Sequence, residues 1–212
     1  LFSPNHVPGL YEAFGMPEFD SMYLKYEKDK SVPRKTVGAQ ELFMDLLKER
    51  AETGRIYIMN IDHCNTHSSF KDKVYMSNLC QEITLPTTPI QHIDDKEGEI
   101  ALCILSAINL GLLTDMNELE ELCDLSVRAL DEIIDYQEYP VEAAKISTQA
   151  RRSLGIGYIG LAHYLAKNQV GYSDKKALKL VDKVTEAFQF YLLKASNNLA
   201  KEKTRCLWFE KT

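Results

Sequence analysis

Hydrophobic residues recur at helical spacing in four stretches of the chain. In residues 39–53 they return every three or four positions, and Gly54 stands where a helix would end. The same spacing predicts three more helices, over residues 115–136, 158–167 and 174–203. Cys123 falls on the apolar stripe of the first of these three, so we expect it in the core. Residues 1–34 differ, because four prolines interrupt their apolar clusters and favour short helices and turns.

Two runs are typical of β-strands. Residues 55–61 are rich in β-branched and aromatic side chains, and residues 77–85 form a second extended run that prolines close. The polar stretch 63–76 between them predicts a loop. Residues 99–110 are almost wholly apolar, which fits a strand or a helix buried on all sides. The pattern predicts a mixed α/β fold, with strands early and mostly helices after residue 112.

The composition is that of a chain that can bury a core. Of its 212 residues 45% are hydrophobic, the formal net charge is −6, and the basic residues form no block, which argues against a nucleic-acid polymer as partner. The cysteines number five, no apolar run approaches the length of a membrane span, and no targeting pattern opens the chain. We therefore expect free thiols and a cytoplasmic location. The chain also lacks an initiator methionine, and we expect it to be one piece of a larger body.

The residues best suited to chemistry cluster in the run 77–85. Alternate side chains of an extended strand share a face, so Asn78, Cys80 and Glu82 would line one surface. A thiol can carry covalent or one-electron chemistry, a carboxylate can accept a proton, and an amide can hold a hydroxyl group. The simpler interpretation is a buried cysteine in a strand whose polar residues face solvent. Spacing alone leaves both interpretations open.

Two other patterns do not predict a site. Residues 155–160 read Gly-Ile-Gly-Tyr-Ile-Gly, but a dinucleotide fingerprint follows a strand, and residues 147–154 are polar and helix-like. We expect these glycines to allow close packing or a turn between helices. A metal cluster can be sketched from one cysteine and three neighbours, but the second cysteine pair typical of structural zinc is missing. We expect no metal there, only a loop held by side-chain hydrogen bonds, formed by Asp62, His63, Cys64 and His67.

Longer stretches resemble the large, catalytic subunit of class I ribonucleotide reductases. The likeness runs from LFSP and VPGLYEAF at the start to FYLLKASNNLAKE near the end. Its main segments are DHCNTHSSF (62–70), SNLCQEITLPT (77–87), GEIALCILSAINLG (98–111) and RRSLGIG (151–157). The asparagine-x-cysteine-x-glutamate motif is the most diagnostic part. The resemblance implies that residues 1–212 are the central part of the catalytic barrel domain, within a ten-stranded α/β barrel.

The resemblance also implies a role for each residue of the motif. Cys80 matches the radical cysteine at the tip of a loop, whose thiyl radical takes the 3′ hydrogen of a ribonucleoside diphosphate. Glu82 matches the carboxylate that accepts the 3′-hydroxyl proton as water leaves the 2′ position. Asn78 matches the amide that hydrogen-bonds the ribose hydroxyls. All three would contact the substrate.

Other positions have implied roles away from the ribose. Cys103 matches one member of the redox pair that supplies two electrons and becomes a disulfide. Its implied partner lies outside this chain, although the distance limit for a disulfide does not exclude Cys64 or Cys80 from sequence alone. Arg55 and Tyr57 match positions near the route of the radical. A strand-end arginine and a core aromatic residue explain those two equally well.

The implied activity is the reduction of ribonucleoside diphosphates to 2′-deoxyribonucleoside diphosphates for DNA synthesis. This chain would bind no cofactor directly, because a metal-containing small subunit delivers the radical and ATP or dNTP effectors bind other parts of the large subunit. The implied partners are those other parts, the small subunit, and thioredoxin or glutaredoxin as reductant. The alternative is a non-catalytic assembly or binding fragment of a split large subunit.

Overall fold

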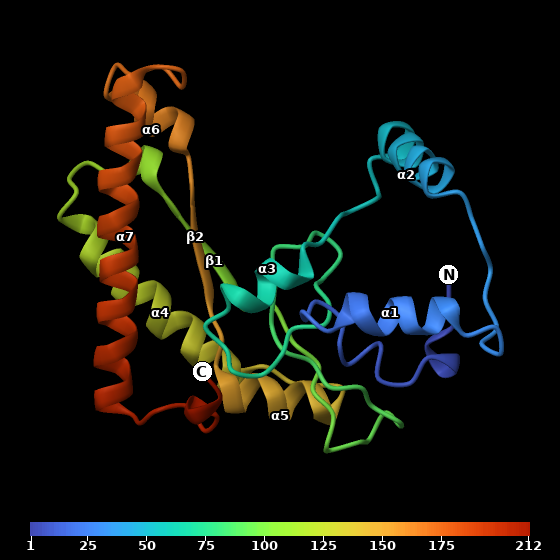
Figure 1. Ribbon diagram of the computed structural model, residues 1–212. Coiled ribbons are helices and arrows are strands. Elements are labelled where there is room, and N and C mark those ends of the chain that lie inside the picture. The colour runs from blue at the N-terminus through green and yellow to red at the C-terminus, as the bar shows by residue number, and fades with distance from the viewer. The chain divides into compact units, whose positions relative to one another are not determined.

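Seven α-helices and a two-stranded parallel sheet make up the computed structural model of the chain, which describes residues 1–212 (Figure 1). The residues divide into two units, Leu1–Thr87 with Thr212, and Thr88–Lys211. Helices and strands occur together, which confirms the mixed α/β class. None of the helices is both long and apolar enough to span a membrane.

The first unit is built from helices and irregular segments. A 3-10 turn and helices α1, α2 and α3 span Pro4–His6, Phe19–Lys28, Ala39–Thr53 and Ile61–Thr66. The helix predicted over residues 39–53 is confirmed. Gly54 ends it with a left-handed φ of 66°, which a residue without a Cβ adopts at little cost. The short helices and turns predicted for residues 1–34 are present as well.

The two strands predicted for this unit are absent. Residues 55–60 form an irregular segment, and residues 77–87 form a loop. Strand propensity reflects how well side chains fit a pleated sheet, and neither segment pairs with a neighbouring strand that would complete its backbone hydrogen bonds. The loop predicted for residues 63–76 is partly wrong, because α3 includes its first residues.

A thin apolar core holds the first unit together. Val7, Leu10, Ala13 and Val74 are its buried hydrophobic residues. The Asn65 side chain on α3 fixes Val74 from two sides. Its Oδ1 accepts from the Val74 N–H at 2.8 Å, and its Nδ2 donates to the Val74 carbonyl at 2.9 Å. Helix α3 thereby anchors the segment that leads into the 77–83 loop.

Two parallel strands form the sheet of the second unit. Strand β1, Leu105–Asn109, pairs with β2, Gly155–Ile159, so the apolar run 99–110 is a strand in its second half. Parallel neighbours need a long crossover connection. Helices α4, Glu118–Tyr136, and α5, Glu142–Arg151, lie within that connection, after a 3-10 turn that follows β1 (Figure 1).

The helix predicted over residues 158–167 begins later than expected. Strand β2 ends at Ile159, Gly160 turns the chain with a φ of 74°, and α6 spans Leu161–Lys167. The turn has no space for a side chain, because a Cβ at Gly160 would collide with the Asn109 side chain. A strand of five residues is too short to interrupt the helical pattern visibly, which explains the misplaced boundary.

Helix α7 packs along α4 and completes the main core of the second unit (Figure 1). It spans Lys175–Glu202, and with α4 it confirms two predicted helices. The core cluster comprises Ile108, Leu110, Leu113, Leu119, Cys123, Val184 and Phe188. Cys123 is buried as predicted, and burial raises the pKa of its thiol to about 11, which keeps it protonated. Ile133, on the same helix, is 44% exposed.

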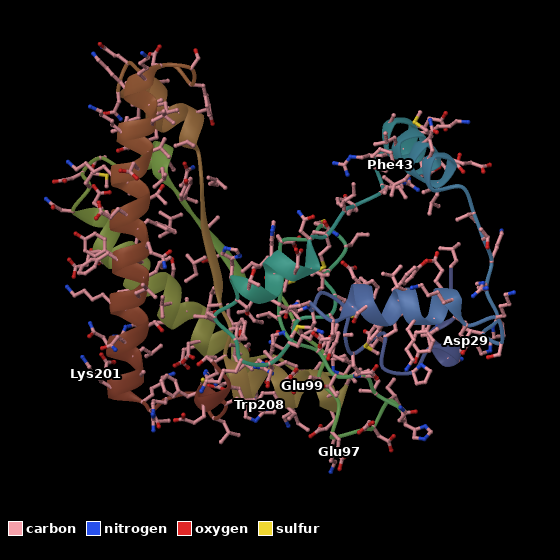
Figure 2. The ribbon with its side chains drawn as sticks, in the orientation of Figure 1. Asp29, Phe43, Glu97, Glu99, Lys201 and Trp208 are labelled. Carbon is pink, nitrogen blue, oxygen red and sulfur yellow. The ribbon has the colours of Figure 1, made fainter.

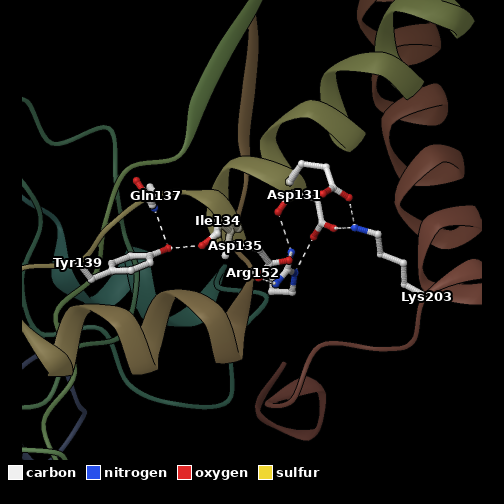
Figure 3. Close-up of polar contacts among 8 residues, drawn as sticks. Asp131, Ile134, Asp135, Gln137, Tyr139, Arg152 and Lys203 are labelled. Atoms are coloured by element: carbon white, nitrogen blue, oxygen red, sulfur yellow. Dashed lines mark hydrogen bonds and ion pairs between the residues drawn. The ribbon is translucent and has the colours of Figure 1, made fainter.

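A network of ion pairs joins α4 to the residues that follow α5 and α7 (Figure 3). Arg152 donates from Nε to Asp131 Oδ1 at 2.6 Å and from Nη1 to Asp135 Oδ1 at 2.8 Å. Lys203 donates to Asp131 Oδ2 at 2.9 Å and also pairs with Glu132. Burial alone would raise the pKa of Asp131, but the hydrogen bonds from Arg152 and Lys203 outweigh it and lower the pKa. Asp131 is therefore a buried but charged carboxylate.

Replacing Arg152 by alanine should lower the free energy of unfolding by about 2 kcal/mol at neutral pH, because the buried Asp131 keeps only Lys203 as a partner. The folded-state pKa of Asp131 lies below the ordinary value of 3.8, so this stabilisation is present above that value and is lost as pH falls through the lowered pKa. Urea unfolding of both forms across that pH range measures the effect. Lys194→Ala removes a solvent-screened pair with Glu120 and should lower the free energy of unfolding much less. Equal losses in the two variants would contradict the role of Asp131.

Candidate functional site

Cys80 lies at the tip of a short loop that its own neighbours close. We call residues 77–83 the Cys80 loop. At its base the Ser77 hydroxyl donates to the Ile83 carbonyl at 2.6 Å, and the Ile83 N–H donates to Asn78 Oδ1 at 3.0 Å. The side chains of Ser77 and Asn78 therefore hold the backbone at Ile83, on the other side of the cysteine.

A tight turn inside the loop carries the cysteine. The Gln81 N–H donates to the Asn78 carbonyl at 3.2 Å, and Gln81 adopts a left-handed φ of 62°. That conformation costs a residue with a Cβ about 1 kcal/mol, which the hydrogen bonds of the loop offset. Leu79 is 80% exposed, and Cys80 is exposed as well. The loop thus presents the thiol outward.

The prediction that Asn78, Cys80 and Glu82 share one face of a strand is wrong. The turn breaks the alternation that would align them, because Asn78 directs its Oδ1 at the backbone of its own loop. Glu82 follows the turn and is exposed. The simpler interpretation, a buried cysteine in a strand, is also wrong. What the three residues share is one small loop.

An open hollow of about 440 Å³ lies beside the Cys80 loop. Gln81 and Thr84 form one side of it. The segment before α3 and α3 itself form the other side, through Ile58, Met59, Asn60, His63, Cys64 and His67. The lining combines apolar side chains with amide, imidazole and hydroxyl groups, a mixture typical of small-molecule sites of this volume. The hollow and the loop both belong to the first unit.

The residues from which a metal site was sketched lie on or next to α3. Asp62 Oδ2 and His63 Nε2 lie 3.9 Å apart on exposed side chains, and His67 Nδ1 lies 3.2 Å from the His63 carbonyl and 3.0 Å from the Thr66 hydroxyl. The segment is a helix and not the expected loop, although side-chain hydrogen bonds do occur in it. Among residues 1–212 no three possible ligands converge on one point.

Cys103 lies in the second unit, just before β1, and its side chain is exposed. Its backbone is held on both sides. The Ile100 carbonyl accepts from the Ser147 hydroxyl at 2.6 Å, and the Ile104 carbonyl accepts from the Gly155 N–H at 2.9 Å. Ile104 itself is buried in a core cluster. The arrangement combines a fixed backbone with an accessible thiol, and no disulfide joins Cys103 to another cysteine of the chain.

The glycines at residues 155–160 form β2 and the turn after it, and not a turn between helices. Gly155 stands opposite Leu105, whose side chain fills the place that a Cβ would need. The expected close packing is therefore confirmed at this position. A dinucleotide fingerprint places its glycines after a strand, whereas here Gly155 and Gly157 lie in the strand itself.

Arg55 and Tyr57 occupy the irregular segment before α3. Tyr57 is 47% exposed, and the Arg55 N–H donates to the Thr53 hydroxyl at 3.2 Å. Arg55 therefore does not end a strand, and Tyr57 is not a buried core residue. Their nearness to a radical route stays a prediction.

Sequence reasoning missed three residues that shape these sites, namely Ser77, Ser147 and Arg151. Asparagine often bonds to nearby backbone in turns, so the Ser-Asn pair before Cys80 did carry a signal for a turn. Ser147 and Arg151 contact the segment that carries Cys103. No rule of helix or strand periodicity links these two residues of α5 to Glu99 and Ile100, which lie much earlier in the sequence.

Comparison with known proteins identifies the family. The sequence model described as "Ribonucleotide reductase, barrel domain" matches residues 1–212. The chain is 59% identical to ribonucleoside-diphosphate reductase subunit alpha of Haemophilus influenzae, 57% to that of Buchnera aphidicola subsp. Schizaphis graminum, and 56% to ribonucleoside-diphosphate reductase 1 subunit alpha of Escherichia coli. Each comparison covers 100% of this chain but only 28–29% of the relative's length. The chain belongs to the ribonucleotide reductase barrel-domain family.

Proposed function

We propose that this chain supplies the radical cysteine loop and one redox cysteine for the reduction of ribonucleoside diphosphates to 2′-deoxyribonucleoside diphosphates. Further polypeptide of the large subunit completes the site, because the chain spans 28–29% of the length of its relatives. The observation that carries the proposal is the exposed Cys80 thiol at the tip of a loop that Asn78 closes. A thiol held at a fixed place and open on one side can reach a hydrogen atom of a bound ligand.

Cys80 begins the reaction. A metal-containing small subunit supplies the oxidising equivalent that makes Cys80 a thiyl radical. The sulfur then takes the hydrogen atom from C3′ of the ribose, which forms an S–H bond and leaves the unpaired electron on C3′. Glu82 accepts the 3′-hydroxyl proton as the 2′-hydroxyl leaves. Asn78 donates a hydrogen bond to a ribose hydroxyl through Nδ2, an atom that takes no part in closing the loop.

Cys103 and a second cysteine outside this chain provide the reducing equivalents. Together the two thiols give up two electrons and two protons and become a disulfide. One proton leaves with the 2′-hydroxyl as water, and the other becomes the new hydrogen on C2′. Glu82 then returns its proton to the 3′ oxygen, and Cys80 returns its hydrogen atom to C3′ and is again a radical. The balance is one ribonucleoside diphosphate and two thiols converted to one deoxyribonucleoside diphosphate, one water and one disulfide, which thioredoxin or glutaredoxin reduces.

A pair of substitutions at Asn78 separates its two tasks. Asn78→Asp keeps an oxygen that can close the loop but removes Nδ2, and we expect kcat/KM to fall about tenfold for one lost hydrogen bond. Asn78→Ala removes both groups and should lower kcat/KM about a hundredfold. The measurement is steady-state reduction by the completed enzyme. Equal losses in both variants would contradict the loop-closing task.

The proposal is tested by assaying reduction with the chain alone, and then with the rest of the large subunit and the small subunit added. We expect product only in the complete mixture. A correctly assembled mixture without product would favour the alternative, a non-catalytic assembly fragment. One observation supports assembly in both cases: α2 leaves its apolar residues largely uncovered, including Phe43, which is 57% exposed (Figure 2).

A further inference from the structure

The segment that carries Cys103 is anchored at three points within the second unit. We call residues 99–104 the Cys103 segment. At its start Glu99 exchanges backbone hydrogen bonds with Thr88, at 2.9 and 3.1 Å. The Ser147 hydroxyl holds the next carbonyl, and the last carbonyl is held from β2, as described above. The thiol of Cys103 is the exposed part of an otherwise fixed stretch.

A buried ion pair reinforces the first anchor. Arg151, the last residue of α5, donates from Nη2 to Glu99 Oε2 at 2.9 Å. The two side chains are only 4% and 11% exposed. The guanidinium also lies 5.0 Å from the ring centroid of Trp208, and Lys211 approaches Glu99 Oε1 at 3.6 Å. Figure 2 shows Glu99 and Trp208 close together beside α5.

Stability alone is a poor explanation for this pair. Removing two charges from water costs several kcal/mol, and apolar residues of similar size often stabilise a protein as well or better. A guanidinium that donates to a carboxylate and stacks on an indole ring has, however, a narrowly defined geometry. What the pair fixes is the backbone at Glu99, four residues before Cys103.

We infer that Arg151 and Ser147 are positioning residues for Cys103. Helix α5 holds the Cys103 segment so that the thiol is presented at one place for disulfide formation. This inference rests on the proposed redox role of Cys103. A thiol that is pre-placed pays less conformational entropy when it forms a disulfide, so loss of the anchor should shift the equilibrium toward the thiols.

The test is the reduction potential of the Cys103 disulfide in the completed large subunit, measured by equilibration with dithiothreitol buffers. Arg151→Met keeps an unbranched, flexible side chain but removes the guanidinium and its charge. We expect it to shift the dithiol–disulfide equilibrium about tenfold toward the thiols, which makes the potential about 30 mV less negative. Arg151→Lys retains a charge for Glu99 and should recover part of the shift.

Arg128→Met is the matched control. Arg128 is another arginine of the second unit that pairs with carboxylates, but its partners are the more exposed Asp124 and Glu202 and neither belongs to the Cys103 segment. It should leave the potential unchanged. If Arg151→Met does not fold, Ser147→Ala takes its place as the test variant, because it removes the donor to the Ile100 carbonyl. We expect it to shift the dithiol–disulfide equilibrium about threefold toward the thiols.

An unchanged potential in the folded Arg151→Met subunit, or in Ser147→Ala if that variant has to decide, would overturn the positioning inference. The proposed function fails by a different result. If the wild-type subunit forms no disulfide at Cys103 during reduction, the redox role itself is wrong. A wild-type disulfide with a potential that Arg151→Met leaves unaltered would refute only the role of α5.

Discussion

Cys80→Ser should lower ribonucleoside diphosphate reduction by at least about 1,000-fold, which corresponds to a barrier about 4 kcal/mol higher. The O–H bond of serine is much stronger than the S–H bond of cysteine, so serine cannot take over the radical. The loop should keep its shape, because Ser77, Asn78 and Ile83 form its closing hydrogen bonds. Formation of deoxyribonucleoside diphosphate by the completed enzyme measures the effect.

Cys206→Ser is the control for this substitution. Cys206 is another of the free thiols. It lies in the segment after α7 and lines no candidate site. Its replacement should leave reduction within about twofold of wild type. A loss at Cys206 as large as the loss at Cys80 would contradict a special role for the exposed loop thiol. Substrate binding should persist in both variants, since neither change alters the fold.

Cys103→Ser should lower product formation by at least about a hundredfold, because one thiol of the pair can no longer give up its electron and proton. The reason differs from that for Cys80. Removing Cys103 leaves the hydrogen-abstracting thiol in place, so the reaction should begin but not end in a deoxyribonucleotide. Analysis of the products released from a single enzyme equivalent checks this.

Normal product formation by Cys103→Ser would exclude this cysteine from the redox pair. Cys64→Ser provides a comparison at another thiol of the chain, which lies on α3. If Cys64→Ser blocked the second half of the reaction and Cys103→Ser did not, the pairing implied by resemblance would be wrong. Cys64 would then be the better candidate for the redox role.

The three longest helices, α2, α4 and α7, could be predicted from the sequence because each carries its own signal. Helix α2 has an apolar period of three to four residues and a glycine at its end, and α4 and α7 bury residues at the same spacing. The strands could not be predicted in the same way. Residues 55–61 have strong strand propensity but no partner strand, whereas β2 contains two glycines and sits beside Leu105. A strand depends on its neighbour, which local sequence does not specify.

The candidate site was predictable in its members but not in its geometry. The alternation of Asn78, Cys80 and Glu82 drew attention to one short stretch, which the structure shows as a loop. Its shape depends on the left-handed backbone of Gln81, and glutamine gives no local signal for that conformation. The anchors of Cys103 come from α5, distant in sequence, and only the folded chain brings them together.

The most direct test of the account follows the 3′ hydrogen. The completed enzyme is given a ribonucleoside diphosphate with tritium at C3′, and tritium released to water is compared in wild type, Cys80→Ser and Cys103→Ser. The account predicts that wild type returns the tritium to C3′ of the product. Cys103→Ser should release tritium to water, because its reaction begins but does not end and the hydrogen left on the Cys80 sulfur exchanges. Cys80→Ser should give neither product nor release. Tritium released by Cys80→Ser as fast as by Cys103→Ser, or tritiated product formed by Cys80→Ser, would show that another group takes the hydrogen, and the central claim would be wrong.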